Sequence, residues 1–279
     1  ASDVYKRQAG VGQRAIHSSQ MGATRATGVW WLITSDSRMP HGVVPGRRQG
    51  RSRALSRYQA VTFAGSITMH ATIVAMPFRK IPRDAWAHLE AGNARFASER
   101  PEHPNTNAYR RAELRSGQAP FAAVLACSDS RVPVEMLFDV GLGDLFVIRT
   151  AGGCVDAAVT GSLEYAVKSL GVSLIVVLSH ESCGAIGAAA SSFEEGDLPA
   201  DLTRVFVEKI APSVLAAKRA GRDDRAGIEE VHAEVTAEHI MARIPTLESK
   251  VAEGSLGVVA ARYRLEDGRV TSVQEHFAG

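Results

Sequence analysis

The stretch Phe121-Ala-Ala-Val-Leu-Ala-Cys-Ser-Asp-Ser-Arg-Val-Pro133 decides the fold class. Its apolar beginning, residues 121–126, has the length and continuous hydrophobicity of a strand buried on both faces, as in parallel sheets. Pro133 suits the first turn of a helix, where the N–H that proline lacks has no helical partner. A strand that runs into a helix indicates an α/β sheet, whose ligands bind at the carboxyl ends of the strands. We therefore expect a ligand site here, with three chemically active side chains: Cys127, Asp129 and Arg131.

A second apolar run, Leu174-Ile-Val-Val-Leu178, is followed by Ser-His-Glu-Ser-Cys-Gly184. Two thiolates and one imidazole then meet at neighbouring strand ends, which predicts a Zn²⁺ site with Cys127, His180 and Cys183 as ligands. Catalytic zinc keeps its fourth position for water, whereas structural zinc takes a fourth protein ligand, for which Asp129 is the nearby candidate. The catalytic interpretation is favoured, because a chain of this length builds a core without a metal staple.

Asp129 and Arg131 stand two residues apart, so an extended segment would point both to the side of Cys127. An ordinary structural ion pair is one interpretation of this spacing. Beside a metal the pair acquires a purpose: Arg131 restrains Asp129 from the zinc, and the freed carboxylate accepts a proton from zinc-bound water.

Composition narrows the class of protein. The 279 residues carry a formal net charge of +2, but the charge is unevenly distributed. The first 75 residues have ten Lys or Arg and two Asp, which gives +8. The remaining residues have 22 basic and 28 acidic side chains, which gives −6. The acidic remainder argues against nucleic acid as a partner, and no apolar stretch is long enough to span a bilayer. Three cysteines fit metal chemistry in a reducing, cytoplasmic compartment, with Cys154 as a small buried hydrophobe.

Residues 1–75 show no sustained helical or strand period and are rich in Arg, Gly and Ser. We interpret them as a disordered or non-native extension, with a basic arm or a targeting peptide as the alternatives. Met76 resembles a natural start, so residues 76–279 are predicted to be the catalytic domain. Thr34-Ser-Asp-Ser-Arg-Met-Pro40 echoes the first motif, but a threonine replaces its cysteine and we treat the match as chance.

The rest of the chain predicts α/β architecture: a mostly parallel central sheet with flanking helices and a C-terminal hairpin strand. An Asp84-capped helix covers 84–96, a strand 144–149, a helix 157–170 and a strand 173–179, the last three forming a βαβ unit. Two longer helices follow at 201–220 and 226–244. Asp267-Gly268 between two strand-like runs predicts a hairpin.

Together, Cys127-Ser-Asp-Ser-Arg131 and His180-Glu-Ser-Cys-Gly184 resemble the β-class carbonic anhydrases from about residue 84 onward. Supporting matches are Gly117-Gln118, Gly143-Asp-Leu-Phe-Val-Ile-Arg-Thr-Ala-Gly152 and Gly161-Ser-Leu-Glu-Tyr165. The resemblance implies one Zn²⁺ per chain on Cys127, His180 and Cys183, and a catalytic dyad of Asp129 and Arg131, with Asp129 as fourth ligand in a closed state. It also implies a homodimer whose substrate pocket is lined by Gln118, Val132, Phe146, Tyr165 and Gly184. Ser179 and Gly153-Cys154 depart from the usual family residues.

The implied reaction is the reversible hydration of carbon dioxide to bicarbonate and a proton by a zinc-bound hydroxide. Two thiolates neutralise the metal more than imidazoles do, so activity should rise into alkaline pH. Two alternatives use the same residues: a hydrolase for carbon disulfide or a related linear molecule, and a non-catalytic zinc regulator closed by Asp129. Intact Arg131 and Gln118 favour the enzyme that hydrates carbon dioxide.

Some members of the family also bind bicarbonate at a second site built from Trp, Arg and Tyr. Arg149 and Tyr263 match two of these positions, but Val124 stands where the Trp should be. Valine supplies neither an N–H donor nor cover for the ion. We therefore expect Arg149 and Tyr263 to serve packing and the dimer contact, and the kinetics to be non-cooperative.

Overall fold

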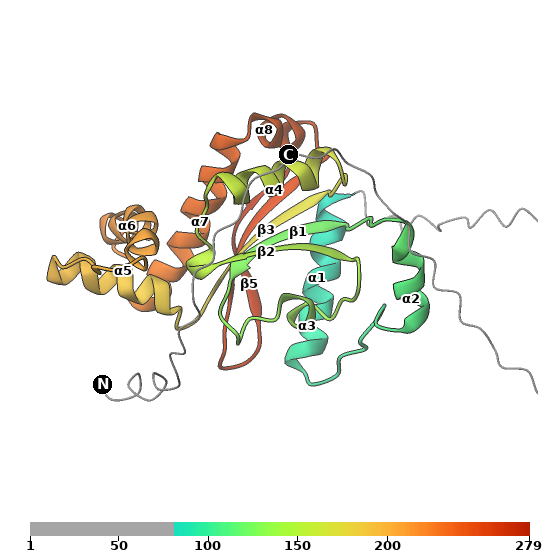
Figure 1. The fold of residues 1–279 in the computed structure, drawn as a ribbon, viewed down its shortest axis with the longest axis horizontal. Helices are drawn as coiled ribbons and strands as arrows, with labels where there is room; N and C mark the ends of the chain where they lie inside the picture. Colours follow the sequence, from blue (N-terminus) through green and yellow to red (C-terminus); the bar gives the residue numbers. More distant parts are fainter. Residues whose placement is uncertain (1–80) are drawn as a thin grey trace, which may run out of the picture. The chain divides into compact units, whose positions relative to one another are not determined.

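The computed structural model describes residues 81–279, which form a five-stranded sheet covered by helices (Figure 1). The strand order is β2-β1-β3-β4-β5. Strands β1 to β4 run parallel, and β5 pairs antiparallel with β4. The strands are β1 (Ala122–Cys127), β2 (Leu145–Thr150), β3 (Leu174–His180), β4 (Gly257–Tyr263) and β5 (Val270–His276). This confirms the predicted fold class, including the C-terminal hairpin at Asp267-Gly268.

Eight α-helices and two short 3₁₀ turns complete the described part of the chain. They are α1 (Pro82–Ala97), α2 (Ala108–Glu113), η2 (Leu114–Ser116), α3 (Val134–Leu137), η3 (Ala151–Gly153), α4 (Ala157–Lys168), α5 (Gly184–Glu195), α6 (Arg204–Arg219), α7 (Arg225–Arg243) and α8 (Pro245–Ala252). None of these described helices is long and apolar enough to cross a membrane.

Alternation along the strands sends neighbouring side chains to opposite faces of the sheet. On one face, Val124, Val176 and Val259 pack against α1 and α3. On the other, Leu125 and Val177 pack against α4, α7 and α8. Both β1 and β3 are buried along their whole length, as their unbroken apolar sequences predict.

A third apolar cluster lies beyond the carboxyl ends of the strands. Figure 1 shows α5 and α6 side by side there, away from the two faces of the sheet. Their buried residues, with the inward face of α7, pack around Cys127, Cys154 and Cys183. The cysteines therefore sit where the sheet meets a separate helical layer.

Two local predictions need correction. The first helix begins at Pro82, so Asp84 lies in its first turn and does not cap it. Proline suits the start of a helix because the backbone N–H groups of the first turn make no hydrogen bond within the helix, so nothing is lost when one is absent. Pro133 is extended and precedes the helix, which begins at Val134. The predicted βαβ unit is present as β2, α4 and β3, and β1 lies between its two parallel strands.

Helix α2 and helix α8 were not predicted, since both are short. The predictions for residues 1–75, for the start at Met76 and for the chance motif at residues 34–40 lie outside the described residues.

Candidate metal centre

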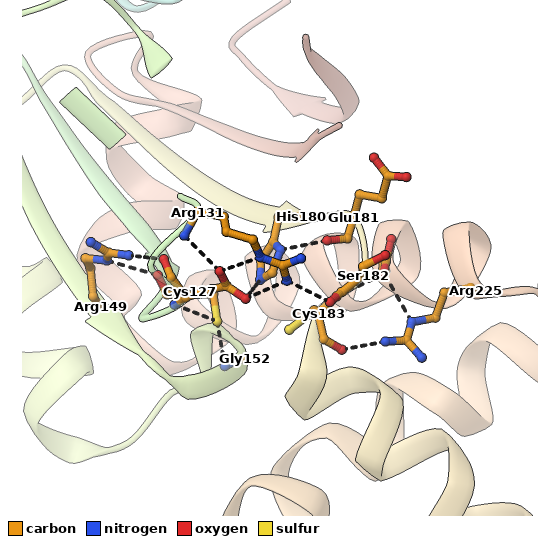
Figure 2. A network of polar contacts seen from close by, with 11 residues as sticks. Cys127, Arg131, Arg149, Gly152, His180, Glu181, Ser182, Cys183 and Arg225 are labelled. Atoms are coloured by element: carbon orange, nitrogen blue, oxygen red, sulfur yellow. Dashed lines mark hydrogen bonds and ion pairs between the residues drawn. The ribbon is translucent and has the colours of Figure 1, made fainter. Parts of the chain in front are cut away.

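The cluster of Cys127, His180 and Cys183 arises from the sheet register. Cys127 is the last residue of β1 and His180 the last residue of β3, and these strands are parallel neighbours. Cys183 lies three residues after the end of β3 and immediately before α5. Their candidate ligand atoms all lie within 4.8 Å of one another, and Figure 2 shows the three side chains converging.

The imidazole of His180 is held in the form that a metal requires. Its Nδ1 lies 2.9 Å from the carbonyl oxygen of Glu181, which can only accept, so Nδ1 carries the proton. The lone pair then resides on Nε2, which is buried and has no hydrogen-bond partner among the described residues. A buried nitrogen without a partner is costly, and a metal bound to Nε2 would remove that cost.

The two thiols share one proton in the absence of a cation. A hydrogen bond from Cys183 holds the pKa of the Cys127 thiol down, to about 4, against the opposing effect of burial. The same hydrogen bond, together with burial, raises the pKa of the Cys183 thiol above its ordinary value. The first thiolate forms easily and the second requires a compensating positive charge. This donor set therefore suits a divalent ion such as zinc.

Asp129 is fixed beside the cluster by Arg131. The guanidinium donates from Nε to Oδ1 at 3.0 Å and from one terminal nitrogen to Oδ2 at 2.8 Å, while the Arg131 backbone N–H donates to Oδ1 at 2.9 Å. These bonds hold the pKa of the Asp129 carboxyl well below its usual range. Arg131 also donates to the carbonyl of Ser182 at 3.1 Å, and Asp129 Oδ2 lies 4.0 Å from His180 Nε2.

The loop that follows β1 is fixed by contacts that the sequence did not predict. Backbone N–H groups of Asp129 and Gly152 donate to Cys127 Sγ at 3.4 and 3.3 Å. Arg149 donates to the carbonyl of Cys127 at 3.0 Å and to the carbonyl of Asp129 at 2.6 Å (Figure 2). Arg149 thus holds the main chain on both sides of Ser128.

Arg149 and Tyr263 match two positions of the family's second anion site, and Val124 occupies the third. Val124 is fully buried within β1, in the cluster that faces α1 and α3. Tyr263 is buried at the end of β4, and burial raises its pKa. With the Arg149 guanidinium bound to two carbonyls, non-cooperative kinetics remain our prediction.

The residues predicted to line a substrate pocket are not gathered in one place within a single chain. Phe146 and Tyr165 lie together, with ring centroids 6.1 Å apart, and Tyr165 is 49% exposed. Val132 is fully buried in the apolar cluster on the other face of the sheet. Gln118, ahead of β1, and Gly184, at the start of α5, are both exposed.

Cys154 lies near the cluster, and all three cysteines are free thiols. Burial raises the pKa of Cys154 to about 11, so this thiol resists ionisation. Cys154 is not part of the group whose ligand atoms converge. Its interpretation as a small buried hydrophobe agrees with both observations.

Two outer partners of the cluster come from α7 and were missed. Glu229 accepts a hydrogen bond from the backbone N–H of Cys183, and His232 bonds to the carbonyl of Gly152. Nothing in the local sequence separates these residues from the solvent-facing charges of a helix. Glu229 lies between Ile228 and Glu230, so its neighbours give no clear sign of burial.

The amino-acid sequence is similar to one family of known proteins. Residues 122–270 match the sequence profile of the family described as carbonic anhydrase. Carbonic anhydrase 2 of Mycobacterium tuberculosis is 47% identical over 196 residues, which cover 70% of this chain and 94% of the relative. A carbonic anhydrase of Mycolicibacterium smegmatis is 46% identical over 189 residues, covering 68% and 92%.

Solved structures agree. A tetrameric β-carbonic anhydrase from Sordaria macrospora is similar with a TM-score of 0.53 and 26% identity, covering 60% of this chain and 87% of the other. A Coccomyxa β-carbonic anhydrase in complex with acetazolamide has a TM-score of 0.53 and 27% identity, covering 60% and 78%.

Proposed function

This chain belongs to the carbonic anhydrase family, in its β class, and from that premise we propose how its residues perform the reaction. It is an enzyme, a lyase that reversibly hydrates carbon dioxide to bicarbonate and a proton. The observation that carries the assignment is the convergence of two thiols and an imidazole whose Nε2 is buried without a partner among the described residues.

We propose that each chain binds one zinc ion through Cys127, His180 and Cys183. Bound zinc lowers the pKa of a coordinated water toward ~7 and so supplies the nucleophile at neutral pH. The chain's part is to hold the donors still: Glu181 fixes the His180 tautomer, and backbone N–H groups orient the Cys127 sulfur.

Asp129 and Arg131 are proposed as the catalytic dyad. Arg131 binds both carboxylate oxygens, which keeps Asp129 ionised and restrains it from ligating the metal. The ionised carboxylate then accepts the proton that the attacking water gives up. Release of Asp129 from Arg131 would produce the closed state, with the carboxylate as fourth ligand.

The substrate pocket is proposed to form between two chains of a homodimer, from Gln118, Val132, Phe146, Tyr165 and Gly184. Two features support this arrangement: the half-exposed ring of Tyr165 beside Phe146, and the position of β2 at an edge of the sheet. A second chain covering these rings would provide the apolar wall that uncharged carbon dioxide requires.

Residues 76–279 are proposed as the catalytic domain, with the first 75 residues dispensable for turnover. A cytoplasmic location is proposed because a zinc site with two thiolates beside a third free thiol suits a reducing compartment.

The test is stopped-flow measurement of carbon dioxide hydration with a pH indicator, together with zinc analysis of the same sample. We expect about one zinc per chain and a hydration rate that disappears when a chelator removes the metal. A zinc-loaded protein that does not hydrate carbon dioxide would refute the proposed function.

A further inference from the structure

One face of α7 lies behind the candidate metal centre and carries three polar residues at helical spacing: Arg225, Glu229 and His232. Positions separated by four and three residues lie on the same side of an α-helix. Glu229 is fully buried and His232 nearly so, which is unusual for these residue types. Polar side chains in such a position need partners, and these partners include the backbone of Cys183 and that of Gly152, whose N–H contacts Cys127.

The first contact is with Cys183. Its backbone N–H donates to Glu229 Oε1 at 3.3 Å, and its carbonyl oxygen accepts from Arg225 at 2.8 Å (Figure 2). The peptide groups on both sides of the Cys183 side chain are therefore held by one helix, which limits the rotation of the residue that carries the sulfur.

The Glu229 carboxylate is compensated inside the protein. Arg262 of β4 binds Oε2 at 2.9–3.0 Å, and Arg225 donates to Oε1 at 3.2 Å. A buried carboxylate is tolerated only when it is paired and hydrogen-bonded in this way. Gly187 of α5 leaves room for the arrangement, because a Cβ there would lie 2.5 Å from the Arg225 guanidinium.

The second contact reaches Cys127 through Gly152. His232 Nε2 lies 2.8 Å from the Gly152 carbonyl oxygen, so this nitrogen carries the proton. Its Nδ1 lies 2.9 Å from Ser213 Oγ and accepts the hydroxyl proton. The Gly152 N–H in turn donates to Cys127 Sγ at 3.3 Å. Four groups from α6, α7, η3 and β1 thus form one directed chain of hydrogen bonds.

Gly152 suits this relay for steric reasons. Its φ of +66° lies in the left-handed region that glycine adopts without strain. A Cβ at this position would lie 2.7 Å from the Cδ1 atom of Ile210. A residue with a side chain would therefore not fit between His232 and Cys127 without a shift of its neighbours, and His232 holds the Gly152 carbonyl by a hydrogen bond.

We propose that Arg225, Glu229 and His232 are positioning residues that hold the two thiolates in ligating geometry from one face of α7. The inference rests on the proposed zinc ligands and adds their outer supports. Outer partners of metal ligands typically change metal affinity or activity by about 10- to 100-fold when removed. A rigid support of this kind acts chiefly on the rate at which zinc leaves.

The test measures zinc release to a chromogenic chelator from the full-length zinc-loaded protein. His232→Leu removes the donor to Gly152, whereas His232→Gln retains an amide donor of similar reach. Thr236→Val is the matched control, because Thr236 is buried one turn along α7 and lines the same ≈ 230 Å³ cavity as His232. We expect about 10- to 100-fold faster release from His232→Leu, partial recovery in His232→Gln and a parental rate in Thr236→Val.

The Cys183 contact is tested with Arg225→Ala against Arg222→Ala. Arg222 precedes α7 and pairs with Glu230 and Glu234, so its loss removes ion pairs of the same helix without touching Cys183. Only Arg225→Ala should accelerate zinc release and alter the thiolate-to-metal absorption of the cobalt(II)-substituted protein.

Thermal unfolding of each zinc-free variant separates positioning from a loss of stability. If His232→Leu releases zinc no faster than Thr236→Val, and Arg225→Ala no faster than Arg222→Ala, the inference is wrong while the zinc site stands. Should His232→Leu fail to fold, Ser213→Ala tests the same relay, with accelerated release supporting it and parental release refuting it. A parent protein that binds no zinc overturns the proposed ligands and this inference together.

Discussion

Replacing Arg131 with alanine removes two charge-assisted hydrogen bonds to Asp129, at 3.0 and 2.8 Å, and one to the carbonyl of Ser182. The Arg131 backbone N–H still donates to Asp129 Oδ1, so the residue stays near its place while its outer oxygen is released. The perturbation therefore tests restraint of the carboxylate and leaves the predicted zinc ligands unchanged.

Asp129 would need to move only a short distance to become a metal ligand. Nitrogen and oxygen ligands of a tetrahedral zinc site lie about 2.0–2.1 Å from the metal and hence roughly 3.3–3.4 Å from each other. Asp129 Oδ2 already lies 4.0 Å from His180 Nε2. A movement below roughly 1 Å would bring the freed oxygen to ligand distance, which closes the site and removes the proton acceptor. General-base catalysis contributes roughly 10²- to 10⁴-fold, so we expect hydration to fall by at least about 100-fold.

The assay is stopped-flow carbon dioxide hydration, with zinc content measured on each sample. Arg131→Ala should keep its zinc and lose the rate, and Arg131→Lys should be intermediate because lysine cannot bind both oxygens. Arg204→Ala, which removes an exposed ion pair with Glu208 on α6, should retain the parental rate. Full zinc with an unchanged rate in Arg131→Ala would refute the dyad mechanism.

Three further outcomes are expected. Cys183→Ser should lose zinc and hydration activity together, and retention of a full equivalent of zinc would show that the ligand assignment is wrong. Burial raises the pKa of Cys154 to about 11, which leaves roughly one thiolate in a thousand at pH 8. Alkylation of this residue, followed by peptide mass spectrometry, should therefore become about tenfold faster per pH unit up to pH 10. Fast labelling at pH 8 would contradict the argument that burial suppresses the thiolate. Hydration rates measured against bicarbonate should show no cooperative inhibition, with Val124→Trp as the comparison, and steep inhibition in the parent would contradict this expectation.

The sequence predicted the elements that carry a strong local signal. The unbroken apolar runs before Cys127 and His180 could only become buried strands, and parallel pairing then brings both residues to one edge of the sheet. Asp267-Gly268 predicted the hairpin equally well, because few residues other than glycine accept its φ of +73°.

Other features depend on contacts between distant residues and could not be predicted locally. The strand order places β1, the first strand in sequence, between β2 and β3, and no local sequence feature specifies this pairing. The burial of Glu229 depends on Arg262, 33 residues further along the chain. The relay from His232 to Gly152 spans 80 residues. A helix pattern alone would place both Glu229 and His232 in solvent.

The central claim is that zinc binds two sulfurs and one imidazole nitrogen in this chain. Zinc-edge X-ray absorption on the purified protein measures this ligand set directly. We predict two sulfur neighbours at about 2.3 Å and one nitrogen at about 2.0–2.1 Å, with a single sulfur in Cys127→Ser if that variant keeps metal. A zinc shell made only of nitrogen and oxygen in the parent protein would contradict the claim.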